Sequence, residues 1–486
     1  MSHPLSNMLS KEKAKYFLFA LGIKILMYCF LYLGLVKENN PYLVGLNYAY
    51  KDFGSYIGPP ANLVNDGTYY EYNEKGKLYA YKTPGTLPLY GPMYYFFGEY
   101  KAQNLLILTQ ILLEGIAAYL LIIIADFLFK NKRINWMVLI LNGISAYVSY
   151  YTIQTTSECL TTSFLIFTIY FLIRFYQNYS LKDLFWCGFF AAWAYFMRPV
   201  SILIFLPIII VVYSTVKRRG FNFVNFIKAC LIVSVTFMVS ETAWIYRNYK
   251  LLGEFVPVDQ SQKQFGSPSM QAMFKLITSW GGNNQAWIEK GEAHWFFQYP
   301  YNETVTQNEM IFHCFPKHVL ETIPADSLNE IKSNFLVING KKLDSISTPI
   351  SNKIISKCNY FTAKYKSEHL FRYHFSSRLR VLALFLFPKQ TFNLTYHQPD
   401  MLSKLIRLFF LVHYYFILLI FIIGLAFLRP NFISRNLLLF ILSVIILYSV
   451  VMRLSENRYL VTVFPIITMF SCYTINQLLI KIKKVE

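Results

Sequence analysis

Long apolar runs recur along the chain, and they constrain its fold more than any other feature. The first extends from Tyr16 to Val36, and others follow as far as the C-terminal end. A helix needs about 20 predominantly apolar residues to cross the hydrocarbon core of a bilayer. Charged residues make up 15% of the chain, whereas soluble proteins carry about 25%. The sequence therefore predicts an all-α polytopic membrane protein.

About ten transmembrane spans fit this pattern. Their approximate bounds are 16–36, 104–129, 134–151, 159–176, 184–197, 199–215, 227–245, 405–428, 436–452 and 459–480. With these spans, the basic clusters at the helix ends fall on the side of both termini, and they contain Lys11, Lys130, Arg218, Arg435 and Lys481. The positive-inside rule makes that side cytoplasmic. The clusters also explain the net charge of +20 without nucleic acid as a partner.

The spans divide the chain into three parts. Residues 1–245 form an N-terminal transmembrane module, and its first loop, 37–103, lies outside the cytoplasm. Residues 246–404 form a large extracytoplasmic loop or subdomain, and 405–486 carry the C-terminal helices. Two aromatic segments are too short to span, and we expect them to lie in the membrane interface: 87–100 and 378–387.

The first loop is longer than a membrane anchor requires and is rich in polar residues. Asp52 lies shortly after the first span, and Lys82 precedes a Pro84-Gly85 turn. A carboxylate at this place can act as a general base that accepts a proton from a hydroxyl or an amine. The alternative is a solvated turn residue before Gly54, and position alone favours this alternative.

Further charged residues lie at the outer ends of the other spans. Glu158 suits a cation, an arginine partner or the positive end of a helix. Arg198, Arg247 and Arg458 carry the guanidinium group that binds phosphate oxygens in planar pairs, although a single arginine here more often reaches toward lipid headgroups. Glu456 is also close enough in sequence to pair with Arg458.

Several familiar signatures are absent from the sequence. There is no P-loop, dinucleotide-binding glycine motif or zinc-protease motif, so direct use of ATP or an activated nucleotide is not expected. The histidines of the second loop have no metal-ligand spacing, among them His294, His313, His318, His369, His374 and His397. Cys314 and Cys358 lie in the same loop, and the sequence leaves open whether they form a disulfide.

Taken together, the motifs resemble the GT-C class of membrane glycosyltransferases, and in particular the bacterial family related to protein O-mannosyltransferases and aminoarabinose transferases. The resemblance rests on motif order along 1–260 and 400–480. The matching residues are Asp52, Tyr56, Ala61, Leu63, Gly67, Tyr69, Lys82-Thr83-Pro84-Gly85, Ser157-Glu158, Arg198-Pro199, Arg247-Asn248-Tyr249, Gly253, Phe255-Val256-Pro257, Glu456-Asn457-Arg458-Tyr459 and Pro465. Lys82 stands where the family more often has arginine.

This resemblance implies a GT-C fold, a location in the bacterial inner membrane and transfer of a sugar on the extracytoplasmic face. The donor would be a polyprenyl-phosphate sugar, and the acceptor a lipid, a glycan or a protein. Asp52 would deprotonate the acceptor, and direct displacement would invert the anomeric carbon. Candidates for the donor phosphate are Lys82, Arg247 and Arg458; supporting residues are Glu158, Arg198 and Glu456; contacts to sugar or acceptor are Tyr56, Tyr69 and Tyr81.

Two questions stay open at this point. Some GT-C enzymes use a divalent metal cation and others do not, and Glu158 is the candidate ligand here. The alternative function is a flippase for polyprenyl-linked oligosaccharides or a polysaccharide polymerase. A flippase should carry charges in the middle of its spans, and the clearest examples in this sequence are Lys24, Glu114 and Glu241.

Overall fold

The computed structural model describes residues 11–37, 42–49, 52–73, 76–258, 267–285, 291–297, 311, 314–339, 347–388, 401–427 and 430–482. These residues are mainly helical, and two short antiparallel hairpins occur among them. The predicted all-α polytopic fold is therefore confirmed. The chain forms two compact units: one of Met1–Ser261, Gln390–Val444 and Leu460–Glu486, the other of Gln262–Lys389 and Ile445–Tyr459.

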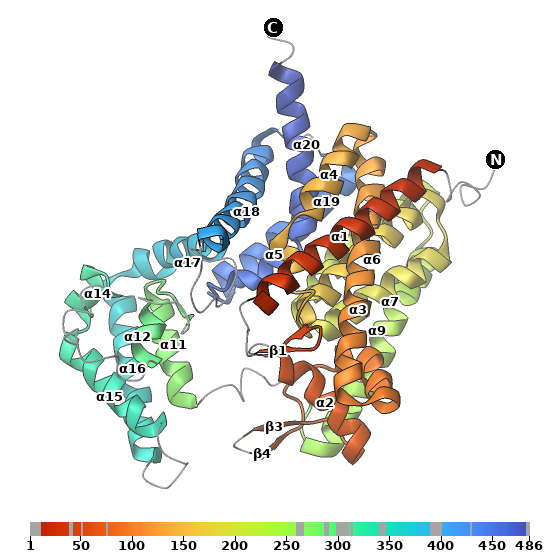
Figure 1. The fold of residues 1–486 in the computed structure, drawn as a ribbon. Coiled ribbons are helices and arrows are strands. Elements are labelled where there is room, and N and C mark those ends of the chain that lie inside the picture. The colour runs from red at the N-terminus through yellow and green to blue at the C-terminus, as the bar shows by residue number, and fades with distance from the viewer. Residues whose placement is uncertain are drawn as a thin grey trace. The chain divides into compact units, whose positions relative to one another are not determined.

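The first unit contains most of the long helices (Figure 1). In chain order its elements are α1 (Lys11–Lys37), β1 (Leu43–Val44), β2 (Asn47–Tyr48), α2 (Phe53–Asp66), β3 (Glu71–Asn73), β4 (Gly76–Leu78), η1 (Pro84–Thr86), α3 (Leu87–Phe129), α4 (Lys132–Gly143), α5 (Ala146–Ser149), α6 (Ser157–Asn178), α7 (Leu181–Met197), η2 (Pro199–Ile204), α8 (Phe205–Arg218), α9 (Phe223–Leu252), α18 (Met401–Phe427), α19 (Phe432–Ile446) and α20 (Phe464–Ile482). Helix α6 packs against α3 and α7, and α7 packs against α9.

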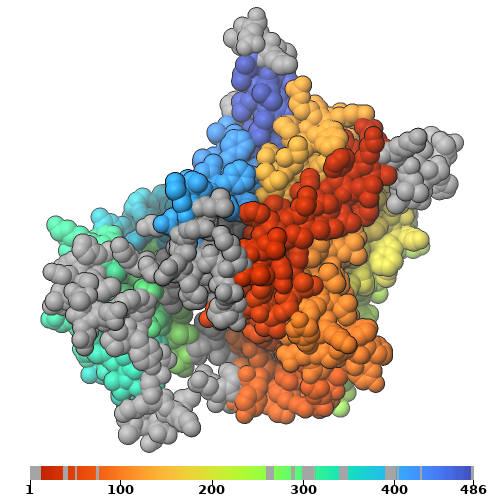
Figure 2. Space-filling view, in the orientation of Figure 1, coloured from red at the N-terminus to blue at the C-terminus, as the bar shows by residue number. Residues whose placement is uncertain are grey.

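Seven helical stretches in the described part of the chain are long and apolar enough to cross a membrane. They are Glu12–Gly34, Pro84–Phe129, Ser157–Asn178, Pro199–Arg218, Phe223–Leu252, Lys404–Ala426 and Phe432–Val451. Their outer surfaces are apolar: along α1, whose surface is red in Figure 2, Leu18, Leu26 and Leu33 are each more than 60% exposed. The three other predicted spans fall on α4 with α5, on α7 and on α20.

The structure differs from the expected span at 134–151. Helix α4 ends at Gly143, and its 12 residues rise only about 18 Å, which is less than a hydrocarbon core of about 30 Å. The helix α5 that follows has four residues, and residues 150–156 are non-helical although every one of them is buried. A buried stretch of this kind must have its backbone groups satisfied by other parts of the protein.

A buried ion pair supports this stretch from the side of α1 and α3. Lys24 Nζ lies 2.7 Å from Glu114 Oε1, and it also donates to the Asn142 carbonyl at 2.8 Å and to Ser149 Oγ at 3.1 Å. Glu114 in turn accepts from Ser149 and from Thr152 Oγ1, at 2.9 and 2.7 Å. The two mid-span charges therefore hold the end of α4 and the start of the non-helical stretch in place.

The segment 87–100 is separate from the span that follows it, as expected. Gly98 has φ 72° and ψ 172° and breaks α3 at this point. Glycine adopts a positive φ at low cost, whereas other residues do not. The aromatic residues beside the break are exposed, among them Tyr95, Phe96, Phe97 and Tyr100. Their location in the membrane interface stays a prediction.

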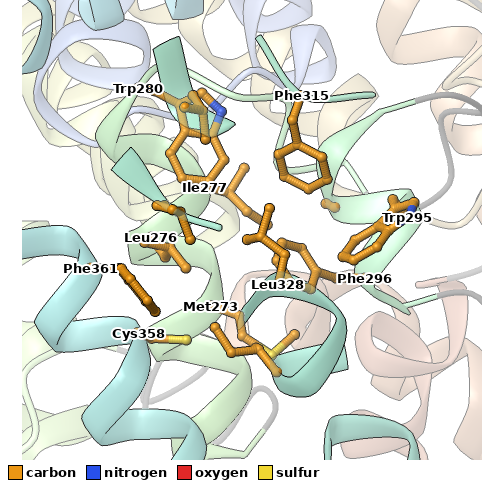
Figure 3. Packing of buried hydrophobic residues seen from close by; sticks show 14 of the residues in the cluster. Met273, Leu276, Ile277, Trp280, Trp295, Phe296, Phe315, Leu328, Cys358 and Phe361 are labelled. Atoms are coloured by element: carbon orange, nitrogen blue, oxygen red, sulfur yellow. The ribbon is translucent and has the colours of Figure 1, made fainter. Parts of the chain in front are cut away.

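The second unit has its own apolar core (Figure 3). Its elements are α11 (Pro268–Ser279), α12 (Glu292–Phe297), α14 (Lys317–Thr322), α15 (Ala325–Asn339), α16 (Ser347–Glu368), η3 (Arg372–Ser376), α17 (Ser377–Leu386) and η4 (Leu447–Val451), while η5 (Asn457–Thr462) begins in it. Met273, Leu276, Trp280 and Phe315 pack together in this core. Cys314 and Cys358 both belong to the core, and both are free thiols. His313 and His397 lie outside the described residues.

Lys24→Met tests the role of the buried ion pair. This change leaves the Glu114 carboxylate buried without its cation, so we expect a loss of about 3–5 kcal/mol in the free energy of unfolding. The double variant Lys24→Met/Glu114→Gln removes both charges and should recover most of the loss. Thermal unfolding in detergent measures both effects. Equal stability of the single variant and the wild type would contradict this role.

Candidate functional site

Side chains from distant parts of the first unit position the start of the first loop. Asn47 Nδ2 donates to Gln103 Oε1 and to Thr155 Oγ1, and the Thr155 amide donates back to Asn47 Oδ1 at 3.1 Å. The Tyr48 amide donates to the Ile153 carbonyl at 2.7 Å. β2 is therefore attached to the buried stretch that precedes α6, and this attachment fixes the chain a few residues before Asp52.

Asp52 stands at the N-terminus of α2. Its carbonyl accepts a hydrogen bond from the Ser55 amide at 3.1 Å, whereas its carboxylate does not cap the helix. The carboxylate influences Glu71 on β3 and also Tyr81. The pKa of Glu71 is raised, chiefly by burial and also by the charge of Asp52. A 2.7 Å hydrogen bond from Ser55 and the charge of Lys82 oppose this rise. Asp52, Glu71 and Lys82 therefore lie within electrostatic reach of one another.

Lys82 completes this group from the other end of the loop. Its ammonium lies 5.4 Å from the ring centre of Tyr56 and 5.3 Å from that of Tyr81, within the range of cation–π attraction. Burial raises the pKa of Tyr81, and the Lys82 charge opposes this rise. Four of the predicted residues therefore lie close together: Asp52, Tyr56, Tyr81 and Lys82. We call these four residues and Glu71 the Asp52 centre.

Glu71 belongs to this centre but has no predicted role. It was not identified because its position depends on strand pairing: Glu71 faces Leu78 across the hairpin of β3 and β4. No spacing in the sequence indicates that its side chain turns toward Ser55 and Asp52. One of its carboxylate oxygens, Oε2, is buried and has no hydrogen-bond partner among the described residues.

The Pro84-Gly85 turn lies directly against the end of α7. Trp193 Nε1 donates to the Gly85 carbonyl at 2.9 Å, and Thr86 Oγ1 donates to the Tyr56 carbonyl at 2.6 Å. A β-carbon on Gly85 would stand 2.3 Å from the carbonyl oxygen of Phe196, so only glycine fits. The motif that contains Lys82 and the Arg198-Pro199 motif, which are far apart in sequence, therefore meet in the structure.

Glu158 and Arg198 form a buried ion pair. Arg198 Nη2 lies 3.0 Å from Glu158 Oε1, and the two side chains are 7% and 2% exposed. Of the partners that the sequence leaves open for Glu158, the structure therefore has the arginine. Within the described ranges, no group of three or more His, Cys, Asp or Glu residues is arranged to hold a metal ion. A cation at Glu158 stays a prediction.

Arg247 connects α9 to the first loop. Its guanidinium donates to the carbonyls of Tyr69 and Tyr79, and to Asn248 Oδ1 at 2.7 Å. It also lies 5.7 Å from the ring centre of Tyr69 and 5.0 Å from that of Trp244. The Tyr69 hydroxyl donates to the Thr83 carbonyl at 3.1 Å. Two of the predicted residues, Tyr69 and Arg247, are thus in contact, and Tyr69 binds the residue that follows Lys82.

A pocket of about 640 Å³ lies beside this contact. Residues of the first loop and of one side of α9 line it: Leu63, Gly67, Thr68, Tyr69, Pro84, Leu87, Ser240, Ala243, Trp244, Tyr246, Arg247, Lys250 and Leu251. The lining is mostly apolar and aromatic, and its two charged residues are both cations, Arg247 and Lys250. We call it the α9 pocket. Trp244 and Lys250 were not predicted, although both share the helical face of Arg247 and could have been found from it.

Glu456 and Arg458 belong to the second unit. Arg458 Nε lies 2.6 Å from Glu456 Oε1, which is the pairing that the sequence left open. The guanidinium also lies 5.4 Å from the ring centre of Tyr459, and this ring stacks on Tyr448. The role of Arg458 toward a phosphate stays a prediction.

Gly85→Ala tests the close approach at the Pro84-Gly85 turn. The added methyl group would collide with the Phe196 carbonyl, so we expect a loss of about 1–3 kcal/mol in stability. Gly22→Ala is the control, because Gly22 lies inside α1 with open space around it and alanine should stabilise a helix there by about 0.5–1 kcal/mol. Thermal unfolding distinguishes the two. A neutral Gly85→Ala would contradict the packing described here.

Comparisons with known proteins agree with the sequence motifs. A family model described as dolichyl-phosphate-mannose-protein mannosyltransferase matches residues 93–245. No curated protein matches the chain.

A solved structure has a similar fold. The archaeal oligosaccharyltransferase AglB from Archaeoglobus fulgidus, solved with an inhibitory peptide and a dolichol-phosphate, is 12% identical with a TM-score of 0.50 over 97% of this chain and 51% of AglB. The chain thus spans about half the length of AglB. ArnT from Cupriavidus metallidurans, bound to undecaprenyl phosphate, is 13% identical with a TM-score of 0.36 over 95% of this chain and 77% of ArnT. Residues 93–245 therefore match a protein mannosyltransferase family model, and the fold of the chain is similar to that of AglB.

Proposed function

We propose that this protein transfers a sugar from a polyprenyl-phosphate donor to a lipid, glycan or protein acceptor. The observation that carries the proposal is the first loop, which gathers Asp52, Lys82 and two tyrosines in one place and also forms a wall of the α9 pocket. AglB, whose fold is similar, was solved with a dolichol-phosphate, and this supports a polyprenyl phosphate as the carrier here.

Asp52 acts as the general base in this proposal. Its carboxylate takes the proton from the acceptor hydroxyl or amine, and the acceptor atom forms a bond to the anomeric carbon. The bond from this carbon to the phosphate oxygen breaks at the same time, and its electron pair leaves with the polyprenyl phosphate. Attack from the face opposite the phosphate inverts the anomeric carbon. Lys82 stabilises the negative charge that grows on the leaving phosphate.

The α9 pocket suits the lipid part of the donor. Its volume of about 640 Å³ lies within the range of roughly 300–1,000 Å³ that is usual for ligand pockets. Leu63, Leu87 and Leu251 offer apolar contacts for isoprenoid units, and the positive charge of the lining suits a phosphate. Pro84 lines the pocket and follows Lys82 by two residues, a distance of at most about 7 Å along the chain. The pocket therefore lies beside the proposed reaction site.

The charge pattern supports a proposed location for the reaction. With basic residues gathered at the cytoplasmic helix ends, the first loop lies on the extracytoplasmic face of the bacterial inner membrane, with both termini in the cytoplasm. The proposal allows a divalent cation, with Glu158 as its ligand. If one binds at Glu158, it must compete with the Arg198 guanidinium 3.0 Å away.

The contacts of two of the mid-span charges, Lys24 and Glu114, favour the enzyme over the flippase. Lys24 and Glu114 bind each other and the neighbouring polar groups, so their charges hold helices together instead of lining a path. A polysaccharide polymerase shares the lipid-linked donor chemistry, and it differs in the acceptor, which is a growing glycan.

A release assay with the purified protein tests this function. The protein is incubated with a panel of polyprenyl-phosphate sugars and with candidate lipid, glycan and peptide acceptors, and the release of polyprenyl phosphate is followed with and without EDTA. We expect release from at least one donor that depends on an acceptor. Loss of release in EDTA would show that a metal takes part. Movement of intact donor across vesicle membranes without any release would support the flippase instead.

Asp52→Asn should lower the rate of transfer by about 10²–10⁴-fold, the usual contribution of a general base. Asp66→Asn is the matched control, because Asp66 lies at the other end of α2 and accepts a hydrogen bond from Tyr70 that asparagine can also accept. Its rate should stay within a few-fold of the wild type. Normal turnover of the donor by Asp52→Asn would reject Asp52 as the base.

A further inference from the structure

The two cations of the α9 pocket have different surroundings. Arg247 is half-buried, and its guanidinium makes three hydrogen bonds, two of them to first-loop carbonyls. It also lies within cation–π distance of the rings of Tyr69 and Trp244. If the guanidinium turned toward a ligand, it would give up bonds that hold the loop on α9. Arg247 is therefore committed to the wall of the pocket.

Lys250 is placed differently. It lies one turn after Arg247, is exposed, and lines the same pocket. Its ammonium is 5.3 Å from the ring centre of Tyr246. A ring face attracts an ammonium without using its hydrogen atoms in strong hydrogen bonds, so these remain able to donate to an anion. A lysine ammonium is a mobile point charge and binds phosphate readily.

The pocket face of α9 has a regular pattern. Most of the α9 residues that line it recur every three or four positions along the helix and lie on one side of it: Ser240, Ala243, Trp244, Arg247, Lys250 and Leu251. Tyr246 lines the pocket from beside this row. Ser240, Ala243 and Trp244 lie toward the middle of the helix, and the two cations lie toward its C-terminal end, beside Leu251. This order fits an amphiphile that has an apolar chain and an anionic head.

We propose that Lys250 binds the phosphate of the polyprenyl donor in the α9 pocket, and that Arg247 acts as a positioning residue that holds the first loop as the wall of this pocket. The proposal rests on the proposed function and refines it. The alternative is that Lys250 has only a structural role, since a basic residue in the last turn of a helix stabilises that helix by about 0.3–1 kcal/mol. That account predicts an effect on stability and none on the recognition of phosphate.

A binding experiment separates these accounts. The full-length protein is titrated with farnesyl phosphate and with farnesol, which has the same chain without the phosphate. Lys250→Gln should weaken the binding of farnesyl phosphate about tenfold, as expected for a lost hydrogen bond to a charged group at an exposed site, and should leave farnesol unchanged. Lys250→Arg should restore most of the affinity. Lys228→Gln, at the other end of α9, is the matched control and should bind both ligands like the wild type.

Arg247→Gln gives the complementary result. We expect it to lower the unfolding temperature and to weaken both ligands alike, because the wall of the pocket is lost. If instead Lys250→Gln binds farnesyl phosphate like the wild type, or if Arg247→Gln keeps its stability and loses only the preference for phosphate, the proposal is overturned.

Two further measurements identify the source of the phosphate and distinguish a failure of this proposal from a failure of the proposed function. An excess of phosphatidylglycerol or of inorganic phosphate should compete poorly with farnesyl phosphate, and equal competition by either would reject a donor site. If the wild type binds farnesyl phosphate no better than farnesol, both the role of Lys250 and the pocket as donor site fail. If the wild type transfers sugar and Lys250→Gln keeps the same KM for donor, only the role of Lys250 fails.

Discussion

The guanidinium of Arg247 connects the first loop to α9, and the geometry of the candidate site depends on this connection. Its two carbonyl partners, Tyr69 and Tyr79, stand on either side of the β3–β4 hairpin. One side chain therefore closes the base of the hairpin and attaches it to a membrane helix. Residues just beyond this base, Tyr81 and Lys82, then lie next to the start of α2. Without the connection, a two-stranded hairpin of this size would be marginal by itself.

Polar side chains also fix non-helical backbone deeper in the first unit. Backbone polar groups that are removed from water need partners inside the protein, and residues 150–156 are buried without being helical. Gln110 Nε2 donates to the carbonyls of Thr152 and Gln154, and the Lys24–Glu114 pair binds the residues just before them. Because Asn47 and Tyr48 are bound to this stretch, the place of the first loop depends on polar side chains within the helices.

The sequence was sufficient for the fold class and for part of the site. Apolar runs of the right length identify spanning helices, and the ordered motifs identify the first loop as the place where chemistry is expected. The gathering of Asp52, Tyr56 and Lys82 agrees with those motifs. The broken helix at Gly143 was not predicted, although Asn142-Gly143 is a typical turn pair, because residues 134–151 are otherwise mainly apolar and the partners that permit the break come from α1 and α3.

The sequence likewise did not predict which partners the charged residues would contact. Glu158 suited several partners, and only the fold brings Arg198 to it. Arg247 was expected to bind phosphate, yet its described bonds go to loop carbonyls, because a hairpin distant in sequence lies against it. Glu71 and Lys250 were given no role because their contacts depend on the fold: on the pairing of β3 with β4 for Glu71, and on the side of α9 that faces the first loop for Lys250. Helical periodicity could have found Lys250 once the face of α9 was known.

The central claim is that the α9 pocket, between the first loop and α9, receives the polyprenyl phosphate. The most direct measurement is photochemical labelling of the membrane-embedded protein with a polyprenyl phosphate whose first isoprenoid unit carries a diazirine, followed by peptide mass spectrometry. The account predicts labels on the first loop near Leu63 and Leu87 and on α9 between Ser240 and Leu251, with unlabelled polyprenyl phosphate as competitor. Competed labels confined to other helices would contradict it.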